Sequence, residues 1–189
     1  MSTLKVDTIL KRTGTGTITL GQSGDTISVP SGATMDLSNA TQTGVGGDNT
    51  PSFLVYSNSG TTVANDANVL IAFQDEQWDT DSAFDSSTNY RFTCPSGQAG
   101  KYFFGASVEL NMTSAVGSTR TMIWKNGSSG INANVGGQAY YHATSVYGVL
   151  NMAVGDYVDC RVYQNSGGSL TSQTGNHYTF FFGYKLIGV

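Results

Sequence analysis

Residues 177–189 read HYTFFFGYKLIGV, and this closing stretch carries aromatic side chains on both faces of an extended chain. Alternate residues of a β-strand point to opposite faces, so four rings share one face and Phe181 interrupts the other. A strand in a monomeric antiparallel sandwich usually keeps one face polar. The stretch is therefore either a central strand of one subunit's core or a strand whose second face meets another subunit. We favour the second interpretation and predict a subunit contact at Tyr178, Phe180, Phe181, Phe182 and Tyr184.

Similar apolar runs, separated by turn residues, recur throughout residues 51–189. Asn126-Gly127 is a preferred pair for a tight hairpin turn because both residues tolerate positive φ. No segment has a sustained apolar period of 3.6 residues, so helices are not expected. About eight strands with closely spaced turns indicate an all-β protein, an antiparallel sandwich or jelly roll. The expected strands lie within 51–57, 68–74, 89–95, 100–112, 120–130, 145–164 and 177–189, and the expected loops are 74–85, 113–119, 128–139 and 164–177.

The N-terminal stretch at residues 13–38, TGTGTITLGQSGDTISVPSGATMDLS, carries apolar residues in pairs two positions apart. This alternation predicts short strands joined by Gly, Ser, Asp and Pro turns. Two apolar residues per strand cannot build a core, so we expect these pairs to be buried only once a partner surface covers them. We interpret residues 1–40 as a short β-repeat stem, 41–50 as a flexible linker and 51–189 as the head. The predicted stem core is Ile18, Leu20, Ile27, Val29, Met35 and Leu37.

The composition is typical of a β-rich extracellular or virion protein rather than a helical cytosolic enzyme. Charged residues make up 12% of the 189, about half the usual quarter, and there are 24 glycines. The net charge is −4, and the nine Lys and Arg are scattered, so no basic footprint for nucleic acid is present. The sequence contains neither a signal-peptide pattern in MSTLKVDTILKR nor an apolar run of the roughly 18 residues that cross a membrane. We therefore expect a chain made in a host cytoplasm, without membrane insertion, that leaves the cell in a virion.

The acidic segment DEQWDTDSAFD at residues 75–85 is the best candidate for chemistry. Paired carboxylates can hydrolyse glycosides, but no neighbouring base or cation network accompanies these. Asp79 and Asp81 match the opening of a calcium-binding loop, but Ala83 takes its fifth position and no glycine follows. We expect a solvated acidic loop, with calcium as an alternative, no other cofactor and no catalytic site.

The two cysteines, Cys94 and Cys160, are too few for a metal site, and His142 and His177 lie in no metal-ligand spacing. We expect two buried thiols. A disulfide between distant strands is the alternative that the sequence leaves open.

A series of short motifs runs through residues 52–189 in a fixed order. The series begins with Phe73, Phe84-Asp85, Phe92-Thr93-Cys94-Pro95 and Gly100-x-Tyr102-x-Phe104, and it continues with WKNG at 124–127, Leu150, Gly155-Asp156-x-Val158 and the closing YTFFFGYKLI. Their order and spacing resemble the complement-type globular head, the trimeric jelly roll related to tumour necrosis factor. Cys94 departs from the usual small residue before Pro, and Tyr184 stands in place of a Phe. The resemblance implies a homotrimeric jelly-roll head.

The stem differs from the collagen stalk of complement proteins, because glycine does not recur at every third position. It resembles instead the N-terminal segments of phage tail-fibre and virion-decoration proteins. Both resemblances imply a homotrimer, in which three copies of the stem would share its apolar core around a common axis. They also imply a non-enzymatic virion structural protein. The favoured function is a trimeric receptor-binding tail fibre whose stem attaches to tail or capsid proteins. A capsid decoration or head fibre is the alternative, and a polysaccharide depolymerase is a third class, for which the chain is small.

Host attachment by the head requires a surface that recognises a cell-surface glycan or protein. The predicted loops are rich in Asn, Gln, Ser, Thr and Gly, which supply adaptable hydrogen-bonding groups. Trp78, Tyr140 and Tyr141 are the candidate ligand-binding residues, because their rings offer flat faces. Core packing is the alternative for each ring. Three heads per trimer would raise a weak single-site affinity through avidity.

Overall fold

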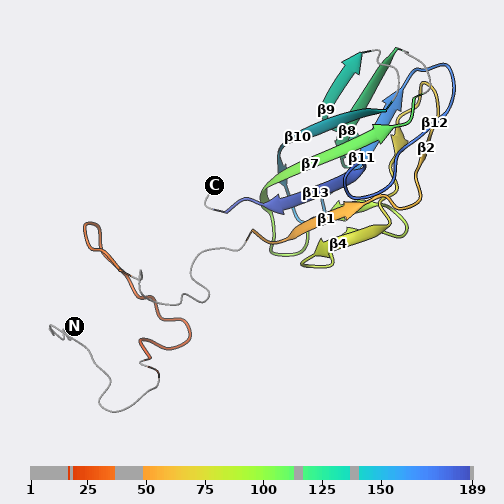
Figure 1. The fold of residues 1–189 in the computed structure, drawn as a ribbon. Helices are drawn as coiled ribbons and strands as arrows, with labels where there is room; N and C mark the ends of the chain where they lie inside the picture. Colours follow the sequence, from red (N-terminus) through yellow and green to blue (C-terminus); the bar gives the residue numbers. More distant parts are fainter. Residues whose placement is uncertain (1–16, 18, 37–48, 113–116, 137–140, 188–189) are drawn as a thin grey trace. The chain divides into compact units, whose positions relative to one another are not determined.

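The computed structural model describes residues 17, 19–36, 49–112, 117–136 and 141–187 (Figure 1). The chain divides into two compact units, Met1–Val45 and Gly46–Val189, and we call the second unit the head. Every strand found among the described residues belongs to the head. None of these residues forms a helix long and apolar enough to cross a membrane.

Five antiparallel strands form the first sheet of the head, in the order β10-β7-β13-β1-β4 (Figure 1). The chain enters the head beside the point where it leaves, because Ser52 lies opposite Tyr184. We call this end of the head the near end and the opposite end the far end. The strands are β1 (Ser52–Tyr56), β4 (Asp75–Asp79), β7 (Gly100–Leu110), β10 (His142–Met152) and β13 (Phe180–Lys185).

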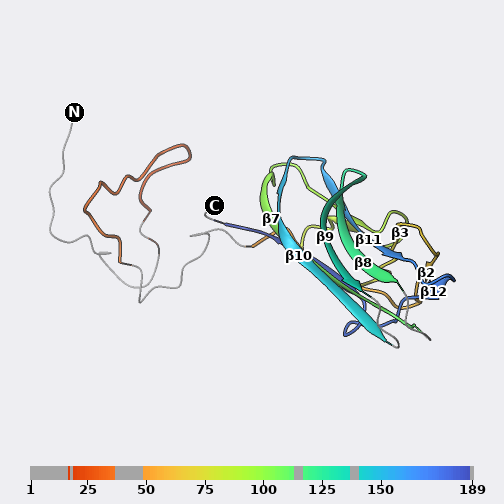
Figure 2. The same ribbon diagram turned by 90° about the horizontal axis from the view of Figure 1, so that it is seen from above.

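The second sheet has the order β5-β6-β11-β8-β9, and β3 also pairs with β11. Figure 2 shows the two sheets as layers, with β7 and β10 on one side and β8, β9 and β11 on the other. A separate two-stranded sheet, β2 with β12, lies at the far end. The strands are β2 (Thr62–Val63), β3 (Val69–Leu70), β5 (Phe84–Asp85), β6 (Arg91–Thr93), β8 (Ser118–Lys125), β9 (Ser128–Gly136), β11 (Tyr157–Gln164) and β12 (Leu170–Thr171).

The core between the sheets is built from alternate residues of each strand, and many of its members are aromatic. The Phe53 ring stacks on Phe92 at 5.2 Å and meets the edge of Phe181 at 5.1 Å. Such offset and edge-on ring pairs stabilise a core beyond the area that they bury. Gly183 lies on this face of β13, where a Cβ atom would overlap the rings of Phe104 and Phe53. A glycine between Phe182 and Tyr184 therefore allows the central strand to approach the core rings.

The predicted hairpin turn is confirmed at Asn126-Gly127, whose φ angles are 50° and 75°. This turn is tied to the turn between β10 and β11, which contains Asp156. The Asp156 carboxylate accepts a hydrogen bond from Asn126 Nδ2 at 2.7 Å and forms an ion pair with Lys125 Nζ at 2.7 Å. The β8–β9 and β10–β11 turns are thereby fixed to each other.

The predicted loops 74–85, 128–139 and 164–177 are wrong in part, since each contains a strand, and one predicted strand is shorter than expected. Residues 75–79 form β4, which pairs with β1 through its backbone although it lacks an apolar alternation. Residues 128–136 form β9, whose small polar residues alternate with half-buried ones such as Ile131. Within 68–74 only Val69–Leu70 is a strand, although Ile71 and Phe73 are fully buried. Edge strands need little apolar content, and this weakens their sequence signal.

The N-terminal unit shows turns but no strand among its described residues, 17 and 19–36. The Asp25 N–H donates to the Gln22 carbonyl and the Ala33 N–H to the Pro30 carbonyl, each at 3.0 Å. The predicted turns are thus confirmed, whereas the short strands, expected in a stem of three chains, stay a prediction. Leu20, Ile27, Val29 and Met35 are all exposed, whereas Ile18 and Leu37 lie outside the described residues.

Candidate functional site

The outer face of the first sheet carries large apolar side chains on all five strands. Phe53 and Val55 of β1 point into the core, so Leu54 and Tyr56 point outward. Trp78 of β4 lies opposite Leu54 and shares its face. We call this surface the aromatic face; it comprises Leu54, Tyr56, Trp78, Phe103, Tyr147, Val149, Phe180, Phe182 and Tyr184.

One row of the aromatic face crosses the whole sheet. In order of pairing it runs Tyr147, Gly105, Phe182, Leu54 and Trp78. The Phe182 ring lies directly over Gly105, since a Cβ atom there would be 2.5 Å from the ring. The glycine therefore leaves room for the end of the Phe182 ring over β7.

Neighbouring rings hold the centre of the aromatic face together. The Phe103 centroid lies 6.0 Å from that of Phe182 and 5.6 Å from that of Tyr184. The two margins are more open, with Tyr147 70% and Trp78 48% exposed. Contiguous exposed apolar surface of this kind is typical of a site of interaction with a protein, a membrane or a ligand.

A hollow of about 300 Å³ lies at the β4 margin of the aromatic face. The Trp78, Phe182 and Tyr184 side chains line it, together with Asn49, Ser52, Phe53 and Gly183. Trp78 is half exposed, so core packing does not account for it. The hollow can receive an apolar side chain from another surface.

A second hollow, of about 380 Å³, lies beside the far end of β7, and we call it the far hollow. Glu109, Tyr141, Gln173 and Tyr178 line it. Tyr141 is one of the predicted ligand-binding residues, and the structure brings it together with Tyr178 and two polar side chains. Tyr140, the third candidate, lies outside the described residues.

The acidic segment is organised by its own hydrogen bonds. Asp85 accepts hydrogen bonds from the Thr88 N–H at 2.9 Å, from the Asn89 side chain at 2.6 Å and from the Ser87 N–H at 3.0 Å. These donors, with Thr88 foremost, hold the pKa of Asp85 well below its usual range. A carboxylate fixed in its charged form in this way supports the β5–β6 turn and is unsuited to act as a general acid.

The calcium candidates do not converge on a shared site. Asp79 Oδ2 accepts a hydrogen bond from the Phe84 N–H at 2.8 Å, which closes the turn after β4. Among the residues that the structure describes, no group of three or more His, Cys, Asp or Glu side chains is arranged to hold a metal ion.

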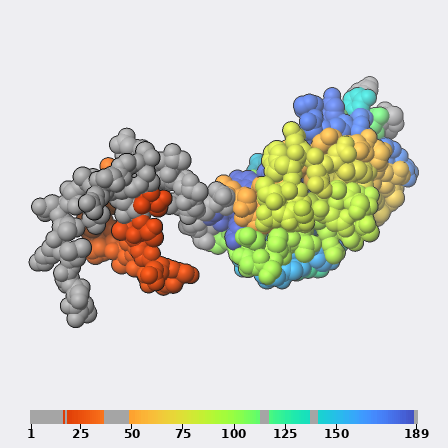
Figure 3. Space-filling view, turned by 90° about the horizontal axis from the view of Figure 1, so that it is seen from below, coloured from red at the N-terminus to blue at the C-terminus, as the bar shows by residue number. Residues whose placement is uncertain are grey.

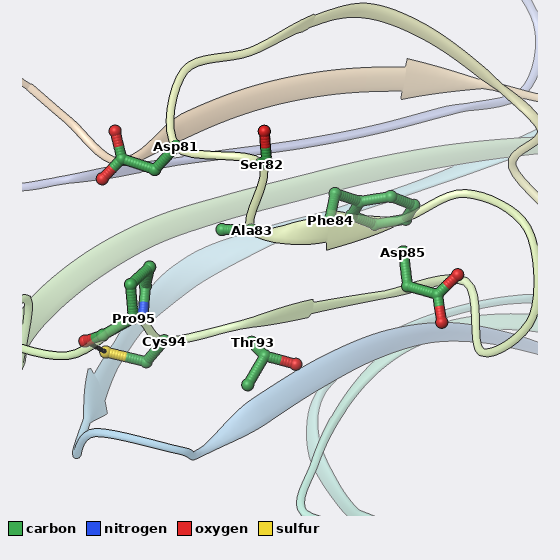
Figure 4. Close-up of a pocket in the computed structure, with 8 residues that line it drawn as sticks. All are labelled: Asp81, Ser82, Ala83, Phe84, Asp85, Thr93, Cys94 and Pro95. Atoms are coloured by element: carbon green, nitrogen blue, oxygen red, sulfur yellow. Dashed lines mark hydrogen bonds between the residues drawn. The ribbon is translucent and has the colours of Figure 1, made fainter.

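The segment from β4 to β6, yellow to yellow-green, covers much of the face of the head seen in Figure 3. A hollow of about 330 Å³ lies between this segment and the end of β6. Figure 4 shows the carboxylates of Asp81 and Asp85 at opposite ends of it, with Cys94 and Pro95 below Asp81. Cys94 is buried, and its Sγ lies 3.8 Å from the Tyr102 hydroxyl. Burial raises the pKa of the Cys94 thiol, so the thiol is a poor nucleophile.

The expectation of two buried thiols is confirmed, since Cys94 and Cys160 are both free and buried. The predicted subunit contact needs one correction. Phe181 is fully buried among core rings of its own chain, so it has no surface to offer a partner. Phe180, Phe182 and Tyr184 lie on the aromatic face, whereas Tyr178 lines the far hollow.

Several residues of the aromatic face and of the far hollow were not predicted from the sequence. Phe103, Tyr147 and Val149 follow the period-two alternation of their strands, so the pattern could have assigned them to the outer face. Glu109 and Gln173 meet only through tertiary structure, and no local signal pairs them.

The sequence matches no protein-family model and no curated protein. Solved structures share the fold of the head. The globular domain of zebrafish complement 1qA is 19% identical, with a TM-score of 0.51, and the match covers 72% of this chain and 97% of that one. Eiger TNF from S. frugiperda is 12% identical, with a TM-score of 0.55 and coverage of 71% and 91%. Murine APRIL is also 12% identical, with a TM-score of 0.55 and coverage of 71% and 98%.

These likenesses define the fold class of the head. It is an all-β antiparallel sandwich, a jelly roll of the complement and tumour necrosis factor type. The predicted resemblance of residues 52–189 is thereby confirmed at the level of fold.

Proposed function

We propose that this protein is a non-enzymatic virion protein, a homotrimeric fibre whose N-terminal segment attaches to the particle and whose head binds the host surface. The aromatic face carries the proposal. A monomer would leave these rings in water, whereas burial stabilises by roughly 25 cal/mol for each Å² of apolar surface. Jelly rolls of the complement and tumour necrosis factor type usually form homotrimers, which supports assembly of this head.

A closed ring of three copies needs two different patches that fit each other. The aromatic face offers such a pair at its opposite margins. Tyr147 and Val149 project from β10, while the hollow beside Trp78 opens near β4 and β13. In the proposed contact the β10 margin of one copy fills the Trp78 hollow of the next.

The N-terminal unit supports the same assembly. Leu20, Ile27, Val29 and Met35 are between 43% and 60% exposed in the single chain. Three copies wound around one axis would cover these side chains. The low charge content and the phage-like stem sequence favour a virion as the setting, and the aromatic, non-catalytic surfaces favour binding over hydrolysis.

The solution mass of the full-length protein by light scattering is the first test. A mass of three times 19.9 kDa is expected, and a monomer would contradict the proposal. The contact itself is tested by the double variant Tyr147→Cys, Trp78→Cys under mild oxidation. Covalent trimers are expected because the proposed contact would bring the introduced cysteines of neighbouring copies together. Both native cysteines are buried, so they should not compete. Each single variant is the control, and it should not cross-link.

The location on the particle is tested by labelling intact virions with an antibody against the head. Label at the tail is expected of a receptor-binding fibre. Label over the shell would contradict that role and identify a capsid decoration instead. Incubation with host polysaccharide should release no new reducing ends, and their release would show a depolymerase.

A further inference from the structure

The far hollow is built by three segments that are distant in sequence. Glu109 ends the outward row of β7, Tyr141 precedes β10, and Gln173 and Tyr178 flank the approach to β13. The backbones around Glu109 are tied together. Its carbonyl accepts a hydrogen bond from the Gln173 N–H at 2.8 Å, and its N–H donates to Thr179 Oγ1 at 3.4 Å. The lining side chains therefore start from positions that the fold fixes.

The polar ends of these four side chains have no partner within the described part of the chain. The Glu109 carboxylate, the Gln173 amide and the two phenol hydroxyls take part in no hydrogen bond or ion pair there. Together they supply acceptors from the carboxylate, donors and an acceptor from the amide, and hydroxyls that do both. The rings are accessible as well, with Tyr141 64% and Tyr178 47% exposed.

We infer that the far hollow binds a neutral sugar unit of a glycan, an inference that rests on the proposed function of the head in host binding. A sugar ring presents apolar C–H faces and a rim of hydroxyls. The tyrosine rings match the faces, and the carboxylate and amide match vicinal hydroxyls. A volume of about 380 Å³ suits one or two sugar units. The Glu109 charge selects against acidic sugars, because like charges repel.

The location suits this role. Ser52 and Tyr184 mark the near end, where the N-terminal segment joins the head. Glu109 lies at the other end of β7 and Tyr178 precedes the start of β13, so the hollow is on the side of the head farthest from that junction. The site lies within a single chain, and a trimer would present three copies of it.

The test is ligand-observed saturation-transfer NMR with full-length protein and six sugars. Glucose, galactose, mannose and N-acetylglucosamine are the neutral probes, and glucuronate and N-acetylneuraminate are the acidic ones. At least one neutral sugar should bind, and neither acidic sugar should. Absence of signal from all four neutral sugars would overturn the inference.

Variants locate the site. Glu109→Ala removes the carboxylate proposed to bind the sugar hydroxyls, and Tyr141→Ala removes a ring proposed to pack on the sugar face. Each variant should weaken binding about tenfold. Glu109→Gln should also admit an acidic sugar. Glu76→Gln is the matched control, since Glu76 is an exposed residue of β4, and it should bind as wild type does. Unchanged binding by both alanine variants would overturn the assignment.

The outcomes separate this inference from the proposed function. A trimer that adsorbs to host cells but binds no neutral sugar keeps the proposed function and rejects the site. A monomer that binds the sugar rejects the trimeric fibre and keeps the site.

Discussion

The outer faces of the two sheets of the head differ although their strands alternate in the same way. On the second sheet, arginines cover the aromatic rings, and an ion pair joins Arg161 to Asp159 at 2.8 Å. Tyr163 also donates a hydrogen bond to Asp66 at 2.8 Å. The stacked pairs are Arg91 over Tyr157 at 4.2 Å, Arg161 over Trp124 at 4.3 Å and Arg120 over Tyr163 at 5.4 Å.

The first sheet has no such cover on its described residues. Its rings contact one another, as Phe103 does Phe182 and Tyr184, and the margins stay open to solvent. Cation–π pairs and ion pairs make the second face compatible with water. One sheet is therefore complete within the chain, whereas the other exposes apolar surface that a partner would cover in the proposed assembly.

The largest expected effect is a loss of folding stability when the core face of β13 is changed. Phe181→Ala removes a ring that contacts Phe53, Phe73 and Phe84. It should lower the free energy of unfolding by about 3–5 kcal/mol, as large-to-small changes in a core do. Chemical denaturation of the full-length protein measures this. A loss below about 1 kcal/mol would mean that Phe181 does not belong to the core.

The next effect concerns assembly rather than folding. Phe182→Asp places a charge in the middle of the aromatic face and should convert the trimer into a folded monomer. Asn132→Asp is the matched control, because it adds the same charge to the exposed β9 on the second sheet. Light scattering and circular dichroism check both variants. An unchanged mass for Phe182→Asp would remove the aromatic face from the subunit contact.

The sequence predicted the fold class and most strands of the core, because apolar alternation follows burial between the sheets. It placed Phe181 at the subunit contact, since a pattern of period two identifies two faces without saying which one is the core. The edge strands β4 and β9 were missed for lack of apolar content. Glu109, Gln173 and Tyr178 meet only in the folded head, so no spacing in the sequence could bring them together.

Acidic pH should have a smaller effect on folding stability, and it should act through the turns that adjoin the second sheet. The Lys125 side chain, followed by Asn126, lowers the pKa of Asp156 to about 2, and hydrogen bonds from Thr88 and Asn89 hold the pKa of Asp85 well below 3.8. A carboxylate whose pKa is lowered in the folded state stabilises the fold at pH values above its unfolded pKa of 3.8. This contribution is lost as the pH falls toward the pKa of the folded state.

The free energy of unfolding should therefore decrease from about pH 4 downward. Asp85→Asn and Asp156→Asn should each flatten this decrease, measured by denaturation from neutral pH to about pH 2. Asp81→Asn, on the acidic segment, is the control. An equally steep decrease in both turn variants would mean that other carboxylates carry the acid sensitivity.

The smallest effect is expected from removal of residues 1–40. The aromatic face lies wholly in the head, so the truncated chain should remain folded and trimeric, with its mass reduced by the deleted residues alone. The four exposed apolar side chains of the N-terminal unit would be covered in the proposed stem, but the head should not need them to assemble. Light scattering at decreasing protein concentration measures this. A monomeric head would reverse the argument, because assembly would then begin in the N-terminal segment and the aromatic face would be too weak to hold three heads alone.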